Sequence, residues 1–476
     1  MNEEELSVLE VISNVNSAVN NFVWGPVVLA MLLGIGIYMS IRLNFFQFRK
    51  AKEILNTTVF AFAKGGDKAQ ESKNVSSFGA MAAAVASTVG VGSIAGVSTA
   101  IVTGGPGAVF WMWISALCGM MTKYSEVLLA VYFRRTDENG IHYGGPMYYL
   151  EDGVHCKPLA IFFSICAGLC CFVTGNMTQT NSISVSLHDA VGFPVWITGL
   201  VVAILAAMVI FGGVKRIASV AEKLVPIMAI FYIVGALIVV AINIKYVPGV
   251  FGSIFKGAFN MKSAGGGIMG YGIMLAMRYG VARGLLSNEA GLGSAPMLHA
   301  TADVDNPVKQ AMWGIFEVFI TTIAICTMTS LVVLASGAID SGLKGASLAA
   351  KAFSMTYGWF GGVFVALAIA FFAFSSLIGW CYYGECAWGY IFKKHKKLVA
   401  MIVRLVWIPA AFIGSITEID LVWSLTDTFN GLMIIPNVIA LIALSGVVIK
   451  ITKLYEQDHN ATNMDVIKEN LKNFKD

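Results

Sequence analysis

Long apolar stretches alternate with short polar loops along most of the chain. Because a membrane-crossing helix needs about 20 predominantly apolar residues, this pattern predicts eleven spans. They are expected near residues 20–44, 77–103, 106–133, 158–182, 193–213, 218–244, 266–295, 309–337, 359–390, 398–416 and 420–449. A short surface helix is predicted at residues 346–357, before the ninth span.

Two of these apolar stretches contain residues that interrupt a helix. The second holds "ASTVGVGSIAGV", residues 86–97, with three glycines and three hydroxyl residues within twelve positions. The seventh holds "SAGGGIMGYGIMLAMRYGVARGLLSNEAGLGSAP", residues 263–296. A broken helix frees backbone groups at membrane depth, which is tolerated only where they line a cavity or bind a ligand. The alternative for a single run is a small-residue packing surface between helices.

The two interrupted helices lie five spans apart. With the first span set aside, spans two to six and seven to eleven form two groups of five. Five crossings per group give the groups opposite topologies, which is the pattern of inverted-repeat secondary transporters. The predicted fold is an all-α membrane protein of eleven transmembrane helices. It has one extra N-terminal helix and a five-plus-five inverted repeat with two discontinuous helices.

Basic residues predict the orientation of these spans. The loop 42–73 contains seven Lys and Arg residues, and further basic residues lie at 134–135, 215–216, 393–397 and in the tail from Lys450. All fall on one side if eleven spans alternate, and basic loops favour the cytoplasm. Lys256 and Lys262 fall on the other side. The N-terminus is therefore expected outside the cell and the C-terminus in the cytoplasm.

This arrangement divides the chain into seven regions. They are an extracellular N-terminus (1–19), the extra helix (20–44), a cytoplasmic loop (45–76), the first repeat (77–244), an external loop (245–265), the second repeat (266–449) and a cytoplasmic tail (450–476). The first sixteen residues are acidic and polar, so no cleavable signal peptide is expected.

Composition supports the membrane assignment. Hydrophobic residues make up 57% of the chain and charged residues 13%, about half the charged share of a soluble domain. So few charges could not cover a soluble surface. The eight cysteines form no paired CxxC motif, and buried free thiols are expected.

Several segments resemble one transporter family. They are "ASTVGVGSIAGVSTAIVTGGPGAVFWMW" (86–113), "GGPMYYLEDG" (144–153), "GVARGLLSNEAGLGSAPMLHATA" (280–302) and "FFAFSSLIGWCYYGE" (371–385). The chain resembles the alanine or glycine:cation symporter family, of the amino acid–polyamine–cation superfamily, from about residue 18 to 450. The resemblance implies sodium-coupled uptake of alanine, glycine or similar small neutral amino acids across the cell membrane. Sodium would be co-transported rather than a cofactor, and no other cofactor is expected.

The chain departs from the usual family pattern at three positions. Ser93 stands where the family usually has Asn, Ser376 where it often has Thr, and Leu286 where it often has Phe. A serine at position 93 lacks the side-chain amide of asparagine, which could bond the substrate or the backbone. The change is therefore expected to affect which substrate side chains are selected and how tightly the substrate binds.

The resemblance also implies a sodium site. Sodium prefers oxygen ligands, and the matched ligands are the carbonyls of Ala86 and Val89 with the hydroxyls of Ser375 and Ser376. The alternative for the two serines is hydrogen bonding to carbonyls one turn earlier in their own helix.

An amino acid zwitterion needs partners of both signs. Its carboxylate is expected at freed N–H groups near Gly90 and Gly92, since half-helix N-termini favour anions. The other expected partners are the hydroxyls of Thr88 and Ser93, the polar side chain of Gln179, and the apolar walls formed by Trp380 and, less strongly, Met277. Gln179 lies in the polar patch "TGNMTQTN" of the fourth span, and its alternative role is an interhelical hydrogen bond.

Charged residues near the spans suggest further roles. Arg283 and Glu289 flank "GLLSN" toward the predicted cytoplasmic end of the seventh span. They are a candidate inner gate, and the alternative is a static ion pair or snorkelling to the interface. Glu317 or Glu385 would be the proton carrier in a proton-coupled variant.

Other functional classes fit the sequence less well. A channel would show a polar stripe along several spans, and an ATP-driven pump would need the GxxxxGK[ST] motif, which is missing. An enzyme would need a nucleophile–base pair or a metal set, and the histidines show no HExxH spacing. A sensor of amino acids stays open, as do proton coupling and serine or glutamine as substrate. The expected partners are the amino acid, sodium and the lipid bilayer, with no nucleic acid. The oligomeric state is left open.

Overall fold

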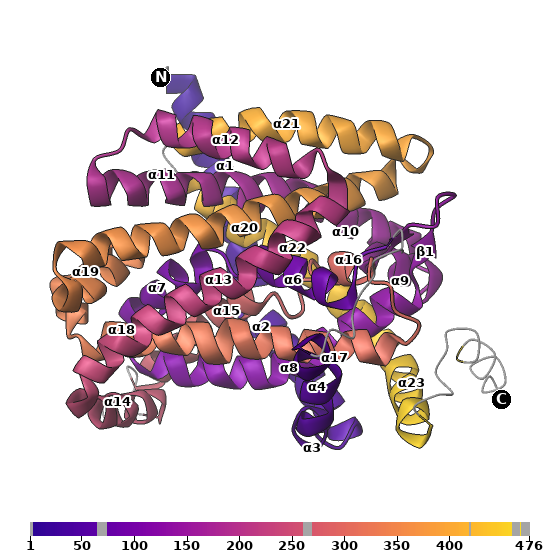
Figure 1. Ribbon diagram of the computed structural model, residues 1–476, viewed down its shortest axis with the longest axis horizontal. Helices are drawn as coiled ribbons and strands as arrows, with labels where there is room; N and C mark the ends of the chain where they lie inside the picture. Colours follow the sequence, from indigo (N-terminus) through magenta and orange to yellow (C-terminus); the bar gives the residue numbers. More distant parts are fainter. Residues whose placement is uncertain (1–2, 64–73, 260–268, 418–419, 459–466, 468–476) are drawn as a thin grey trace.

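The computed structural model describes residues 3–63, 74–259, 269–417, 420–458 and 467. It is built almost wholly from helices, and the long ones run side by side along the horizontal direction of Figure 1. The strands in the described ranges form one short hairpin, in which β1 (Arg135–Thr136) pairs antiparallel with β2 (His142–Tyr143). The predicted all-α class is confirmed.

Eight helical segments are long and apolar enough to cross a membrane. They are Ser13–Arg42, Gly107–Tyr132, Lys157–Val191, Gly213–Ile242, Pro307–Ala335, Trp359–Ile391, Lys393–Ile416 and Val422–Ala443. Shorter apolar helices at Ser77–Thr88, Ala95–Gly104 and Val195–Ile210 lie in the second and fifth predicted spans. Eleven spans result only if the second, fifth and seventh predicted spans also cross the membrane in addition to these eight helices. The count of eleven therefore stays a prediction.

Helix bounds follow local sequence signals. Proline opens α2, α9, α16 and α17, where its missing N–H costs nothing. The helices before residue 260 are α1 (Glu3–Val23), α2 (Pro26–Arg42), α3 (Phe46–Arg49), α4 (Ala51–Thr57), α5 (Val59–Ala63), α6 (Ser77–Thr88), α7 (Ala95–Gly104), α8 (Gly107–Tyr132), α9 (Pro146–Asp152), α10 (Lys157–Cys170), α11 (Thr178–Val191), α12 (Val195–Ile210), α13 (Gly213–Ile242) and α14 (Val247–Phe259). Those after it are α15 (Met269–Asn288), α16 (Pro296–His299), α17 (Pro307–Val318), α18 (Thr327–Ala335), α19 (Gly345–Tyr357), α20 (Trp359–Ile391), α21 (Lys396–Ile416), α22 (Asp420–Ala443) and α23 (Ser445–Gln457). The predicted surface helix at 346–357 corresponds to α19.

The chain leaves the α-helix at both glycine-rich stretches. Between α6 and α7 it forms only a 3-10 turn at Val91–Ser93. Between α15 and α16, Glu289, Gly291 and Gly293 have φ angles of 52°, 92° and 80°. These left-handed angles suit glycine and are unusual for glutamate. The first interruption lies where its glycine pattern predicts it, and the second lies at Gly291 and Gly293. Gly280 and Gly284, which we also expected to interrupt the seventh span, lie within the continuous helix α15 and pack closely against α8.

Two further helical segments contain widened, π-helical turns. One, at Cys171–Met177, joins α10 to α11, and the other, at Phe319–Cys326, joins α17 to α18. Such turns shift the side chains that follow them and are frequent at functional sites. The polar patch of the fourth span lies on and after the first of them.

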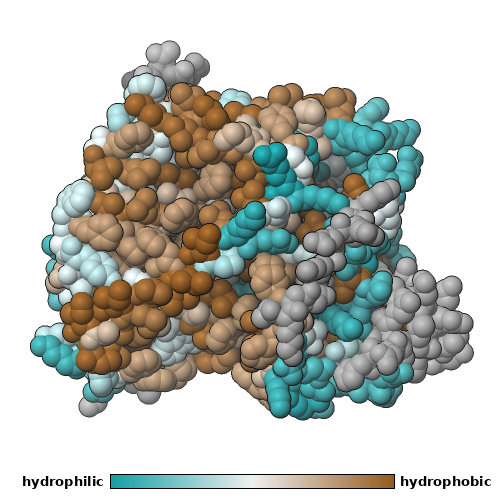
Figure 2. All heavy atoms as spheres, viewed as in Figure 1, coloured by the Kyte–Doolittle hydropathy of each residue, from teal (hydrophilic) through white to brown (hydrophobic). Residues whose placement is uncertain are grey.

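Burial separates interior helices from peripheral ones. The most apolar window is 83% buried in α8 and 67% in α20, against 39% in α13 and 28% in the segment that contains α21. Peripheral helices expose large apolar side chains such as Ile230 and Leu405. Figure 2 shows this as a broad brown surface over the body of the molecule. Such a surface is suited to hydrocarbon rather than to water.

The two ends of the helix bundle carry different short elements. In Figure 1, α14 and α19 lie at the left end, and β1, α9 and α16 lie at the right end. At the right end, Glu151 of α9 forms ion pairs with Arg135 (3.0 Å) and Lys393 (2.8 Å). The basic stretches 134–135 and 393–397 therefore share an end, as expected if these spans alternate.

Candidate functional site

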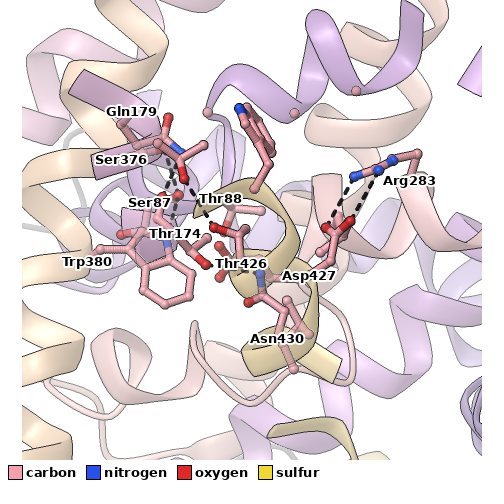
Figure 3. Close-up of a pocket in the computed structure, with 18 residues that line it drawn as sticks. Ser87, Thr88, Thr174, Gln179, Arg283, Ser376, Trp380, Thr426, Asp427 and Asn430 are labelled. Atoms are coloured by element: carbon pink, nitrogen blue, oxygen red, sulfur yellow. Dashed lines mark hydrogen bonds and ion pairs between the residues drawn. The ribbon is translucent and has the colours of Figure 1, made fainter. Parts of the chain in front are cut away.

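A cavity lies at the first helix break, between α6, α7, α11, α15, α20 and α22 (Figure 3). We call it the central cavity. It encloses about 60 Å³, so its occupant must be small. A second cavity of about 700 Å³, here the vestibule, adjoins it and shares Gly96, Arg283, Trp423 and Asp427. Lys344 and Gly345 also line the vestibule, which therefore extends toward α19 at the left end of Figure 1.

Five of the seven predicted substrate residues line the central cavity. They are Thr88, Gly90, Gly92, Gln179 and Trp380. Gln179 spans the site, because its Oε1 accepts a hydrogen bond from the Val91 N–H (3.4 Å) and its Nε2 donates to the Thr174 carbonyl (3.0 Å). Trp380 Nε1 donates to the Ser87 carbonyl (3.2 Å). Both side chains therefore hold the interrupted backbone while they face the cavity.

Gly90 is where two side chains approach the broken backbone most closely. A Cβ atom built on Gly90 would lie 2.7 Å from Ser376 Oγ and 2.9 Å from Gln179 Oε1. Both distances are shorter than normal contacts, so any side chain would push these groups away. A Cβ atom on Gly92, by contrast, would meet open space. The glycine at position 90 lets a hydroxyl and an amide reach the backbone.

The other two predicted substrate residues lie outside the lining of the central cavity. The buried Ser93 hydroxyl shares a hydrogen bond with the Ser287 hydroxyl (3.1 Å), and the Ser93 carbonyl accepts one from Thr329 (2.9 Å). The side chain of Met277 is on the exposed side of α15. The 3-10 turn directs Ser93 toward neighbouring helices, and sequence spacing does not reveal this rotation.

The two serines of α20 contact the broken helix. Ser375 Oγ donates to the carbonyls of Ala86 (2.9 Å) and Phe372 (2.8 Å). Ser376 Oγ donates to the carbonyls of Ala86 (3.2 Å) and Ser87 (2.8 Å). These contacts bring together three of the four predicted sodium ligands. Among the described hydrogen bonds, Ser87 rather than Val89 supplies the second carbonyl.

Both sequence-level interpretations of the serine pair apply in part. Ser375 bonds back to Phe372 in its own helix, whereas both bonds of Ser376 cross to α6. A hydroxyl that donates to a carbonyl can rotate its proton away and present its oxygen to a cation beside that carbonyl. The arrangement therefore offers at least four oxygens within reach of one small, hard cation.

One side of the cavity is more polar than expected. Thr426 and Asn430 of α22 face Thr174 and Thr178, with Thr178 Oγ1 3.1 Å from Thr426 Oγ1 and Asn430 Nδ2 3.2 Å from Thr174 Oγ1. The sequence analysis included Thr174 and Thr178 in the polar patch of the fourth span, but it did not expect polar residues of the eleventh span at the site. The signal was present, because "SLTDTFN" (424–430) repeats the polar character of "TGNMTQTN" within another apolar span.

The candidate gate residues do not contact each other. Arg283 instead pairs with Asp427, at 3.4 Å for each of two N···O contacts, and both side chains are about one-fifth exposed. Glu289 accepts a hydrogen bond from Ser294, because its left-handed backbone turns it into the second break. The Arg283–Asp427 pair, drawn in Figure 3, lines both the central cavity and the vestibule. This position is toward α19, away from the basic end at which the gate was expected.

The N–H groups freed by the second break already have a partner. The Glu126 carboxylate accepts hydrogen bonds from the N–H groups of Gly291 and Gly293, both at 3.0 Å, and from Asn437 Nδ2 at 2.5 Å. A carboxylate at a helix break is electrostatically favourable. The protein's own anion thus occupies N–H groups of the second break, although Glu289 and Leu292 of that break also line the central cavity.

The two candidate proton carriers are both paired. Glu385 forms two hydrogen bonds with Arg404, at 2.6 and 2.7 Å. Glu317 is fully buried and contacts Thr88, Lys123 and His299. Of the two, only Glu317 is joined directly to the broken first helix.

The chain is similar to known proteins over nearly its whole length. The chain matches the sodium:alanine symporter family over residues 9–469. It is 43% identical over 458 residues to the sodium/alanine symporter AgcS of Methanococcus maripaludis, covering 94% of this chain and 98% of that protein. It is also 37% identical over 453 residues to the probable sodium/glutamine symporter GlnT of Bacillus subtilis, covering 95% and 92% of the two chains.

The solved structures show a similar fold. One is a crystal structure of MhsT in complex with L-phenylalanine, with a TM-score of 0.53 and 15% sequence identity, covering 81% of this chain and 98% of that one. At this identity the likeness concerns the fold alone. The family match spans nearly the whole chain, and the curated relatives are similar over more than nine-tenths of it. The chain belongs to the sodium:alanine symporter family.

Proposed function

We propose that this protein is a secondary active symporter that couples inward sodium movement to the uptake of small neutral amino acids, alanine or glycine, by alternating access. The observation that carries the proposal is the small central cavity at the first helix break, with the serine pair of α20 against the same break. A cation site and a zwitterion site thus share one backbone segment. Family membership supports the sodium and amino acid classes.

The substrate carboxylate is proposed to bind the N–H groups near Gly90 and Gly92. Two facts favour the first break over the second. Gly92 borders the cavity with open space where a side chain would be, and Glu126 already bonds the N–H groups of the second break. Gln179 is the proposed polar partner for the rest of the zwitterion, and Trp380 limits the space for its side chain.

Sodium is proposed to bind between α6 and α20. Its ligands would be the carbonyls of Ala86 and Val89 and the hydroxyls of Ser375 and Ser376, with Ser87 contributing a further carbonyl. The site lies next to Gly90. A bound cation would therefore stabilise the backbone segment that receives the carboxylate, and this adjacency is the proposed basis of coupling.

The eleven-span topology completes the proposal. The eight long helices, the broken helices α6–α7 and α15–α16, and α12 make eleven spans. Residues 77–244 and 266–449 would form the two inverted repeats after one extra helix at 20–44. The basic end is the proposed cytoplasmic side, with the N-terminus outside and residues 450–476 inside.

Alternating access requires one end of the cavity to close while the other opens. At the basic end, the Val75 N–H bonds the Thr301 carbonyl (3.2 Å) and the Asp303 N–H bonds the Val75 carbonyl (2.7 Å). Arg134 also donates to the carbonyls of Ala302 (2.6 Å) and Val304 (2.7 Å). These bonds tie the start of the first broken helix to the end of the second. The described conformation is thus closed at the basic end, with the vestibule at the other.

The Arg283–Asp427 pair is the proposed gate between vestibule and cavity. Exposed ion pairs contribute about 0–1 kcal/mol, so the Asp427→Asn variant should open the gate more often without unfolding the protein. A Leu286→Cys substitution provides a thiol in the central cavity, behind this pair. We expect a thiol reagent to modify it up to about fivefold faster in the Asp427→Asn background. Glu456→Gln, which breaks the surface pair with Arg49, is the matched control, and an unchanged rate would remove Asp427 from the gate.

A polar substrate side chain is the second candidate. Thr426 and Asn430 favour it because they offer hydrogen bonds on one side of the cavity. The isosteric Thr426→Val variant should weaken competition by serine about 3- to 10-fold and change competition by alanine less than about twofold. Equal effects on both amino acids would show that the side chain of the substrate does not reach this wall.

The decisive experiment is uptake of radiolabelled alanine into proteoliposomes. An inward sodium gradient is compared with an equal potassium gradient, at fixed pH and voltage. Sodium-driven accumulation that glycine competes away is the expected result. Equal uptake in both, driven only by a pH gradient, would replace sodium with a proton and direct attention to Glu317. Binding of alanine without accumulation under any gradient would favour a sensor.

A further inference from the structure

A second set of polar groups lies against the first helix break, on the side of α8 and α17. Lys123 of α8 and Glu317 of α17 are both fully buried, with Lys123 Nζ 3.4 Å from Glu317 Oε1. The same Oε1 accepts a hydrogen bond from Thr88 Oγ1 at 3.0 Å. Thr88 lines the central cavity. Two residues, Glu317 and Thr88, therefore connect the lysine to the space proposed for the substrate.

Glu317 has a second partner, His299, on its other carboxylate oxygen. Gln310 Nε2 donates to the Ser77 carbonyl (3.2 Å) and to His299 Nδ1 (2.9 Å). His299 Nε2 lies 3.0 Å from Glu317 Oε2. Lys123 therefore forms an ion pair with one oxygen of the Glu317 carboxylate, and His299 forms a hydrogen bond with the other.

Lys123 also acts on two more buried carboxylates. Its charge interacts electrostatically with Glu126 and Glu289 as well as with Glu317. Burial of an ionised carboxylate is costly unless it is paired. The ammonium therefore has a structural reason to stay in place whether or not a substrate is bound.

The first break thus has a possible cation position on each side. On the α20 side, hydroxyls and carbonyls are proposed to hold sodium. On the α8 and α17 side, a carboxylate and the Thr88 hydroxyl would suit a second sodium, but the ammonium already lies there. Two cations on one carboxylate would repel each other strongly at this depth.

We propose that Lys123 is a built-in cation that takes the place of a second sodium ion, so that one sodium ion is coupled to each substrate molecule. The inference rests on the proposed sodium symport. In this role Lys123 is a positioning residue, because it holds Glu317 and through it the hydroxyl of Thr88. Removing the Lys123 ammonium, so that a free sodium ion can bind in its place, should raise the number of sodium ions coupled to each substrate molecule.

The test is the null point of alanine flux in proteoliposomes. With voltage held at zero and a tenfold sodium gradient, net flux should vanish at an alanine ratio of about tenfold for one sodium and about hundredfold for two. We expect about tenfold for the natural chain and for Lys123→Arg. Lys123→Met leaves the Glu317 carboxylate for a second sodium, and its null point should move toward about hundredfold. The double variant Lys123→Met/Glu317→Gln removes both charges and should return to about tenfold.

Each outcome bears on the inference separately from the function. A null point near hundredfold in the natural chain overturns it, even if the methionine variant fails to fold. Sodium transport with a tenfold null point that Lys123→Met leaves unchanged overturns the role of Lys123. If Lys123→Met folds but does not transport, equilibrium binding of radioactive sodium is measured instead. Two ions bound per chain in the variant and one in the natural protein support the inference. One ion bound in both proteins overturns it. Absence of any sodium dependence in the natural chain refutes the proposed symport, and the inference falls with it.

Discussion

Replacing Ser375 and Ser376 together with alanine should raise the sodium concentration needed for half-maximal uptake by about 10- to 100-fold. Both hydroxyls lie against the Ala86 carbonyl, so the double variant removes two oxygens from the proposed site. Charge-assisted contacts are each worth about 1.5–3 kcal/mol, part of which water or the remaining carbonyls recover. The measurement is the sodium dependence of alanine uptake in proteoliposomes.

The matched control removes two buried hydroxyls that bond only within their own helices. Ser164 Oγ donates to the Ala160 carbonyl and Ser330 Oγ to the Cys326 carbonyl, and both serines are fully buried. Ser164→Ala/Ser330→Ala should leave the sodium dependence within about twofold. If the Ser375→Ala/Ser376→Ala variant behaves like this control, the serine pair does not bind sodium.

A single methyl group at position 90 should impair sodium and substrate binding together. In Gly90→Ala the new Cβ atom would lie 2.7 Å from Ser376 Oγ and 2.9 Å from Gln179 Oε1. Overpacking of this kind costs about 1–3 kcal/mol. The displaced groups belong to the proposed sodium site and the proposed zwitterion site. We expect a loss of about 10-fold or more in apparent affinity for both alanine and sodium.

Gly34→Ala is the control for this substitution. Gly34 lies in α2, and a Cβ atom there meets nothing within 4 Å, so uptake should be unchanged and the helix slightly more stable. Alanine affinity is measured by competition and sodium affinity by titration. A Gly90→Ala variant that loses affinity for only one of the two ligands would contradict the view that both sites share this glycine.

Helix positions were predictable because hydrophobic length in a membrane is a local property. The two interruptions were predictable for a similar reason. Glycine and hydroxyl residues within apolar runs, as at residues 86–97, have few uses besides a break or a close contact. The first interruption then directed attention to Thr88, the polar patch of the fourth span to Gln179, and the helical spacing from Ser376 to Trp380. All three line the cavity.

Two misses, Ser93 and Met277, concern the direction in which a side chain leaves its helix. Ser93 follows Gly92 directly, yet the 3-10 turn directs its hydroxyl to Ser287. Met277 lies on the broken helix α15 but on its exposed side. Spacing along a chain fixes which residues share a face only while the helix is regular. At a break, the direction of each side chain depends on the helices packed around it.

The sequence by itself determined the membrane class, the approximate helices, the two interruptions and the resemblance to a transporter family, because these depend on composition, local pattern and long motifs. Only the tertiary structure decided which charges meet. Arg283 pairs with Asp427 of α22 rather than with Glu289, Glu126 fills the second break, and Lys123 is buried against Glu317. These partners lie up to 194 positions apart in the chain. Their pairing follows from the cost of burying an unpaired charge, and helix packing determines which charges are close enough to satisfy one another.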